Sequence, residues 1–159
     1  MQPWLTELQQ LLAHGDAVVL VTVARVEGST PREAGAKMIV TRENARYTIG
    51  GGHLEWRAIE IAREVLRDGM RVPHLRRLER LSLGPSLGQC CGGAVVLAFE
   101  RLDVGDLDWV ASLAKRMHAG QATQRSISFG PAREPVRLAD VDADGGAQAP
   151  DCLLWDGAG

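Results

Sequence analysis

The pattern of apolar and polar positions predicts an alternation of helices and strands. Leucines recur at helical spacing over residues 3–13, with Pro3 in the first turn and Gly15 just past the end, which predicts a helix. Residues 17–24 are continuously apolar apart from Thr22, as in a strand that is buried on both faces. Residues 37–41 and 47–49 predict two further strands.

The second half of the pattern completes one domain. Residues 53–68 predict an amphipathic helix whose apolar stripe is made of Leu54, Ala58, Ile61, Ala62 and Val65. Residues 75–83 and 94–99 predict strands, and residues 107–118 predict a last helix. A strand over residues 123–129 is compatible with the pattern. The fold class that follows is α/β, with a mixed sheet flanked by helices.

The amino-acid composition of the chain changes near residue 135. Residues 139–150 are rich in Asp, Gly, Ala and Gln, which is linker composition. An apolar run then leads into Gly157 and Gly159, as at the start of a dinucleotide-binding unit. We therefore expect a cofactor-binding domain over residues 1–135, a linker over 136–151, and the first strand of a truncated Rossmann-like domain over 152–159. Asp140, Asp142 and Asp144 match the opening of a calcium loop, but neither flank reads as a helix.

Composition narrows the function classes. The 159 residues are 45% hydrophobic, enough for one core, and the formal net charge is −2 without a basic stripe, which argues against nucleic acid. The apolar runs are shorter than the ~20 residues of a membrane helix, and no signal-peptide pattern opens the chain. Cys90 and Cys91 are adjacent and Cys152 stands apart, so a disulfide framework is not expected. We expect a cytoplasmic protein that binds neither membranes nor nucleic acid.

The first candidate loop follows the strand over residues 17–24. Ser29 and Thr30 supply hydroxyl groups, and Arg32 and Lys37 supply positive charge for an anion. Neither charge is expected to be needed for the core. The alternative is a surface turn with solvated charges.

The second candidate is Gly50, Gly51 and Gly52 between a strand and a helix. Three glycines let a ligand approach the backbone, and the free N–H groups of a helix start favour an anion such as phosphate. His53 and Glu55 lie in the first turn. The alternative is a plain connector, with His53 as a cap and Glu55 as a charge favoured by the helix dipole.

The third candidate is a glycine-rich loop with two thiols. Its polar, glycine and thiol members are Ser86, Gly88, Gln89, Cys90, Cys91 and Gly92. Structural zinc needs about four ligands, and no second cysteine pair is present. A thiolate in an open loop suits a soft metal or a sulfur-transfer centre, so Cys90 and Cys91 are the candidate metal ligands, with inert buried thiols as the alternative.

Together these motifs resemble the XdhC/CoxI family. They read EGSTPR at residues 27–32 with GAKM at 35–38, IGGGHLE at 49–55 and GPSLGQCCGG at 84–93, and they look like three signatures of that family in the same order. The resemblance implies an accessory chaperone, not an enzyme, that binds molybdenum cofactor and supports its sulfuration by a cysteine desulfurase. It further implies delivery to the molybdenum-binding subunit of a xanthine-dehydrogenase-like enzyme, a Rossmann-like C-terminal domain, and a homodimer as one oligomeric option.

Two other function classes stay open from the residues alone. One is a fragment of an NAD- or FAD-dependent oxidoreductase, although no complete dinucleotide fingerprint and no acid/base pair stand out. The other is an assembly scaffold without a ligand.

Overall fold

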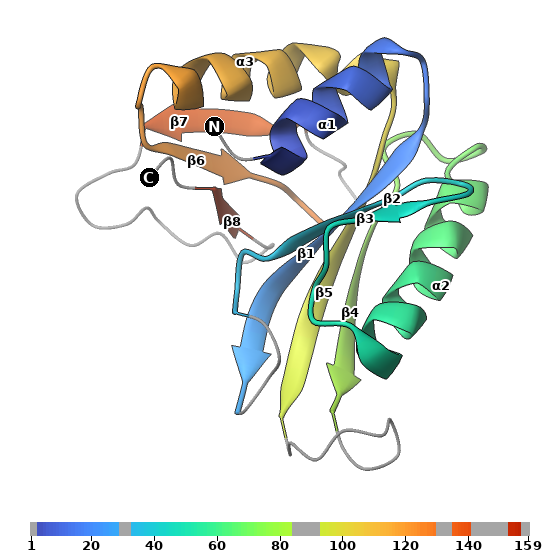
Figure 1. The fold of residues 1–159 in the computed structure, drawn as a ribbon. Helices are drawn as coiled ribbons and strands as arrows, with labels where there is room; N and C mark the ends of the chain where they lie inside the picture. The colour runs from blue at the N-terminus through green and yellow to red at the C-terminus, as the bar shows by residue number, and fades with distance from the viewer. Residues whose placement is uncertain (1–2, 29–32, 84–92, 130–134, 141–152, 157–159) are drawn as a thin grey trace.

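The structure is a computed structural model that describes residues 3–28, 33–83, 93–129, 135–140 and 153–156, the last stretch by its backbone (Figure 1). Its elements in chain order are α1 (Pro3–Ala13), β1 (Val18–Glu27), β2 (Lys37–Val40), β3 (Ala45–Arg46), α2 (Gly52–Asp68), β4 (Arg76–Ser82), β5 (Ala94–Leu102), the short 3-10 helix η2 (Val104–Asp106), α3 (Leu107–His118), β6 (Thr123–Ser126), β7 (Arg137–Asp140) and β8 (Leu153–Asp156).

The main sheet has five strands in the order β3-β2-β1-β5-β4. β1 lies at its centre and pairs with β5 from Val18 opposite Leu102 to Glu27 opposite Ala94, with a bulge between Val23 and Arg25. The expected α/β fold with a helix-flanked sheet is confirmed. All pairings between described strands are antiparallel, where the sequence pattern suggests a mixed sheet.

Helices on both faces explain why the first half of β1 is apolar apart from Thr22. Val19, Val21 and Val23 belong to the core that α2 covers, whereas Val18 and Leu20 belong to the core under α1 and α3. Figure 1 shows α2 on one side of the sheet and α1 with α3 on the other. A doubly covered antiparallel strand therefore carries the continuous apolar pattern that is more common in parallel sheets.

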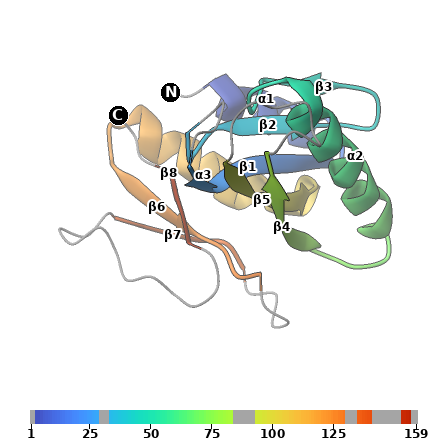
Figure 2. The same cartoon turned by 90° about the horizontal axis from the view of Figure 1, so that it is seen from below.

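A second, three-stranded sheet with the order β7-β6-β8 lies beside α3 (Figures 1 and 2). It is joined to the main sheet by a buried ion pair, in which Arg125 of β6 donates to both carboxylate oxygens of Glu100 of β5, at 2.7 and 3.1 Å. β7 occupies residues of the predicted linker, and β8 occupies residues of the predicted second domain. The domain boundaries themselves stay a prediction, and residues 141–152, with most of the aspartate run, lie outside the described residues.

The strand predicted over residues 47–49 is wrong, because β3 ends at Arg46. Tyr47 has a φ of 66°, which an extended strand does not allow, and its hydroxyl donates to the carbonyl of Pro3 at 3.0 Å. Ile49 then turns into the core beneath α2. Over the described part of the chain, no helix has the length and apolar character that crossing a membrane requires.

Candidate functional site

The flanks of the three motifs meet at one end of the main sheet. Glu27, where the first motif begins, lies opposite Ala94, and Ala94 lies opposite Ser82, so the ends of β1 and β4 and the start of β5 are level. The start of α2 joins them, since Leu54 and Leu83 belong to one core cluster. This is the lower end of the sheet in Figure 1, and we call it the motif end.

Many of the predicted site residues themselves lie outside the described residues. They are Ser29, Thr30 and Arg32 of the first motif and Ser86, Gly88, Gln89, Cys90, Cys91 and Gly92 of the third. What the structure brings together is therefore the start of α2 with the chain segments that lead into and out of these two loops.

An ion pair fixes the residue that opens the first motif. Arg80 of β4 donates to one carboxylate oxygen of Glu27 from two nitrogens, at 3.1 and 2.7 Å, and so reaches across β5. Arg25 lies 3.3 Å from the other oxygen. All three side chains are partly exposed, so the energy of these pairs is small, and their main effect is to orient Glu27.

The glycine triplet has a backbone that other residues adopt poorly. Gly50, Gly51 and Gly52 have φ values of 130°, 77° and 64°. Gly51 is the N-cap of α2, has no side chain that could accept a hydrogen bond from the first N–H groups of the helix, and has open space where a Cβ would stand. The first N–H groups of α2 therefore lack a capping side chain and lie beside a backbone that a ligand can approach, which is the arrangement that favours an anion.

Glu55 has a structural task in this segment. One carboxylate oxygen accepts hydrogen bonds from the Thr48 hydroxyl at 2.5 Å and from the Ile49 N–H at 3.3 Å. The Thr48 hydroxyl oxygen in turn accepts from the Gly50 N–H at 3.0 Å. Glu55 thus ties the segment before the helix to its first turn, and a ligand contact by Glu55 or by the exposed His53 stays a prediction.

Trp56 is a feature that the sequence analysis missed. Its residue surface is 62% exposed, and with Gly52 and His53 it lines a shallow hollow of about 340 Å³. An exposed indole offers a flat apolar face on which a heteroaromatic ring can stack. The signal in the sequence is a tryptophan on the polar face of an amphipathic helix, one turn after three glycines.

Lys37 differs from its expected setting. It is only 6% exposed, its Nζ donates to the Thr22 hydroxyl at 3.2 Å, and it lies 5.1 Å from the centre of the Trp4 ring. The expectation that its charge plays no part in the core is wrong, because α1 and β1 enclose the side chain. A contact between Lys37 and a cofactor stays a prediction.

Among the residues that the structure describes, no three His, Cys, Asp or Glu side chains gather in a way that could hold a metal ion. The predicted ligands Cys90 and Cys91 are not among those residues, so the metal assignment also stays a prediction.

Comparison with known proteins bears on the first two motifs. The model of the XdhC and CoxI family matches residues 11–78, which is under half of the chain. This segment resembles the XdhC and CoxI family, as its motifs predict. The XdhC/CoxI segment runs from the end of α1 into β4 and contains the EGSTPR, GAKM and IGGGHLE motifs, whereas the cysteine motif follows it.

A solved structure resembles the XdhC/CoxI segment and its surroundings in fold. It is a crystal structure of a xanthine dehydrogenase from Bacillus halodurans, with a TM-score of 0.68 and 23% sequence identity. The match covers 86% of this chain and 42% of that one, so the chain spans less than half the length of its structural neighbour. At this identity the likeness shows the fold alone. No curated protein matches the chain.

Proposed function

We propose that this chain is the cofactor-handling domain of an accessory protein that binds molybdenum cofactor during the maturation of a xanthine-dehydrogenase-class molybdenum hydroxylase. The observation that carries the proposal is the meeting of all three motif flanks at the motif end. The family resemblance of residues 11–78 points to the same accessory role. The role is one of binding, protection and delivery, without a catalytic step in this chain.

The described residues at the motif end fit parts of that cofactor. Molybdenum cofactor carries a phosphate, a flat pterin and a dithiolene-bound metal, and it supplies the metal centre of the enzyme that receives it. The uncapped N–H groups at the start of α2, beside Gly51, suit the phosphate. The exposed indole of Trp56, one turn further, suits the ring system.

Residues of the first and third motifs would supply the remaining contacts. The proposal assigns hydrogen bonds and charge to Ser29, Thr30 and Arg32, and it assigns the metal end to Cys90 or Cys91. A thiolate is the softest ligand that the chain offers there. Sulfuration by a cysteine desulfurase and transfer to the molybdenum-binding subunit of the enzyme are the partner steps that the proposal includes.

The test is co-purification from a host that makes molybdenum cofactor. Molybdenum content and the fluorescence of the pterin released on denaturation would be measured for the parent and for Trp56→Ala, Cys90→Ser and Cys91→Ser. The controls are Cys152→Ser and Val104→Ala. Val104 is exposed like Trp56 but lies in η2, away from the motif end.

The parent and both controls should carry pterin and molybdenum, and Trp56→Ala should carry less of both. One of the two cysteine variants should lose molybdenum in preference to pterin. A parent without pterin but with bound NAD would favour an oxidoreductase fragment, and a parent with neither would favour a scaffold. Either result would overturn the proposal.

A further inference from the structure

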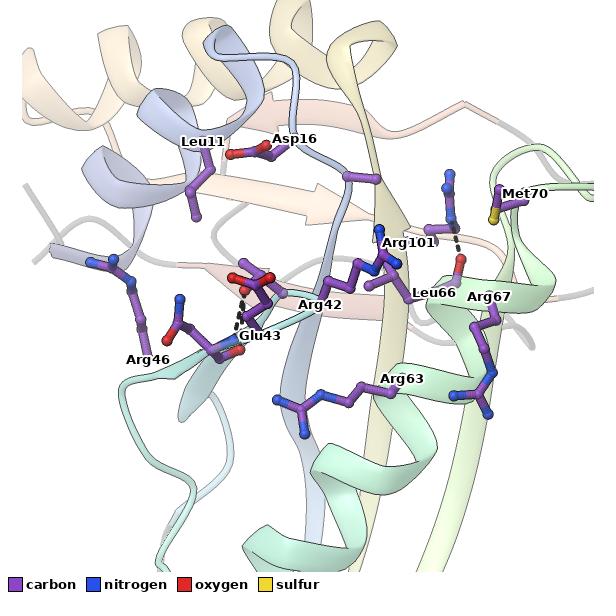
Figure 3. A pocket seen from close by; sticks show the side chains of 13 residues that line it. Leu11, Asp16, Arg42, Glu43, Arg46, Arg63, Leu66, Arg67, Met70 and Arg101 are labelled. Carbon is purple, nitrogen blue, oxygen red and sulfur yellow. Dashed lines mark hydrogen bonds between the residues drawn. The ribbon is translucent and has the colours of Figure 1, made fainter.

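A second cavity lies at the opposite end of the main sheet. It has a volume of about 970 Å³ and is formed by the end of α1, the turn between β2 and β3, the last turns of α2 and the end of β5 (Figure 3). β1 separates it from the motif end by ten residues, or about 30 Å at the rise of an extended strand. None of the residues predicted from the motifs lines it. We call it the arginine pocket.

Five arginines line the arginine pocket, against the two carboxylates of Asp16 and Glu43. The arginines are Arg42, Arg46, Arg63, Arg67 and Arg101. They come from the β2–β3 turn, β3, α2 and β5, so their proximity is produced by the fold.

Two of the five arginines have structural partners. Arg46 forms an ion pair with Glu7 of α1. Arg101 donates to the carbonyl of Leu66 at 3.0 Å and thereby satisfies an acceptor near the end of α2. Its side chain passes so close to Gly69 that a Cβ there would lie 1.8 Å from Arg101 Cδ. These two residues form a fixed wall of the pocket.

The other three guanidinium groups have no partner among the residues that the structure describes. Arg42, Arg63 and Arg67 form no ion pair or side-chain hydrogen bond with any residue that the structure describes. Nε of Arg63 is buried without a hydrogen-bond partner among the described residues, an arrangement that costs free energy unless something accepts from this group. In Figure 3 the Arg63 side chain extends from α2 toward the side of the pocket that the β2–β3 turn forms.

That turn presents Arg42 on a rigid support. The Thr41 N–H donates to the carbonyl of Asn44 at 2.8 Å, and the Asn44 N–H donates to the Thr41 hydroxyl at 3.0 Å. The turn is therefore closed by its own hydrogen bonds. Arg42 can meet a ligand without a rearrangement of the backbone.

We infer that the arginine pocket binds a small organic molecule that carries a phosphate or diphosphate group. Guanidinium groups pair with phosphate through two parallel N–H donors, and the several oxygens of a phosphate can accept from more than one arginine at once. A single carboxylate, by contrast, pairs with the two parallel N–H donors of one arginine. Leu11, Leu66 and Met70 give the pocket apolar surface for the rest of the molecule, and its volume lies in the range of small-molecule sites.

The experiment is calorimetric titration of the whole chain with pyrophosphate, and with citrate as a polyanion without phosphorus. Arg42→Gln and Arg63→Gln should each weaken pyrophosphate binding at least tenfold. The matched control is Arg57→Gln, which removes an exposed arginine of the same helix that pairs with Glu60 at 2.6 Å. Its affinity should stay within twofold of the parent.

Pyrophosphate affinity and the pterin content of the co-purified chain are separate readouts, so that this inference and the proposed function fail separately. Equal affinity in the parent and both pocket variants would overturn the inference. So would an equal loss in Arg57→Gln, which would indicate attraction by overall charge, or citrate binding as tight as that of pyrophosphate.

Discussion

Replacing Arg125 by methionine removes one partner of the ion pair between the two sheets. The methionine side chain is also long and unbranched, but it carries no charge. Both members of the pair are 0% exposed, and Arg125 also lies 5.0 Å from the centre of the Trp109 ring. Arg125→Met would leave the Glu100 carboxylate buried without its bidentate partner. Arg76 lies opposite Glu100 on β4, but it donates to the carbonyl of Ser128 at 2.9 Å.

The expected loss for Arg125→Met is about 3–5 kcal/mol in the free energy of unfolding, the usual cost of an uncompensated buried charge. The double variant Glu100→Leu with Arg125→Met removes both charges. It should recover to within about 1 kcal/mol of the parent, because the pair's own desolvation cost disappears with it. The two substitutions should therefore be strongly non-additive.

Urea unfolding followed by far-UV circular dichroism measures these differences, provided that the slope with denaturant is the same for each variant. A loss below about 1 kcal/mol for Arg125→Met would refute the claim that the pair is buried and tightly coupled. A double variant as unstable as the sum of the two single variants would refute it equally.

Three further predictions concern single features of the fold. Thr22→Val keeps the shape of the side chain but removes the hydroxyl that accepts from Lys37. Urea unfolding should show a loss of about 1–3 kcal/mol in the free energy of unfolding, and an unchanged value would contradict the buried hydrogen bond. Glu55→Ala should destabilise the start of α2 by about 1–2 kcal/mol and speed hydrogen exchange at the Ile49 amide, while Glu60→Ala, the control on the same helix, should leave that amide unchanged. Gly51→Ala should cost about 1–2 kcal/mol by thermal unfolding because its φ is 77°, although the space for a methyl group is open.

Local patterns were sufficient to predict the main helices and most strands. The apolar stripe from Leu54 to Val65 and the glycine that follows the helix predict α2 almost to the residue. Both the buried face and the end of a helix depend on residues that are close together in the sequence. β3 could not be placed this way. Its end is set by Tyr47, which has a positive φ and whose hydroxyl donates to the carbonyl of Pro3, 44 residues earlier in the chain.

The same limit applies to charged residues. Lys37 looks like a surface cation because its partners Thr22 and Trp4 are remote in sequence, and only the packing of α1 on the sheet encloses it. Arg125 looks like part of a polar strand until β6 is placed against Glu100. The arginine pocket likewise cannot be predicted from local sequence, since its arginines belong to three separate parts of the chain, near residues 42–46, 63–67 and 101.

For the motif end, the sequence indicates the three motifs but not the strand pairing that brings their flanks together. The convergence of the segments that flank these loops depends on the pairing of β4 and β1 with the two edges of β5, which the sequence of residues 75–83 does not predict. The apolar stripe of α2 predicts which residues are buried, and it gives no role to Trp56 on the polar face. A large aromatic side chain exposed on that face is the sequence feature that indicates a binding surface.

The most direct test of the cofactor site is hydrogen exchange of the whole chain with and without added molybdenum cofactor. If the cofactor binds at the motif end, the amides of Gly52, His53 and Leu54 should gain protection, because these N–H groups lack intrahelical acceptors and would donate to the ligand's phosphate. Peptides that cover Asn44 and Met70, in the arginine pocket, should exchange as before. Protection confined to those peptides, or no change at the start of α2 under saturating cofactor, would contradict the account.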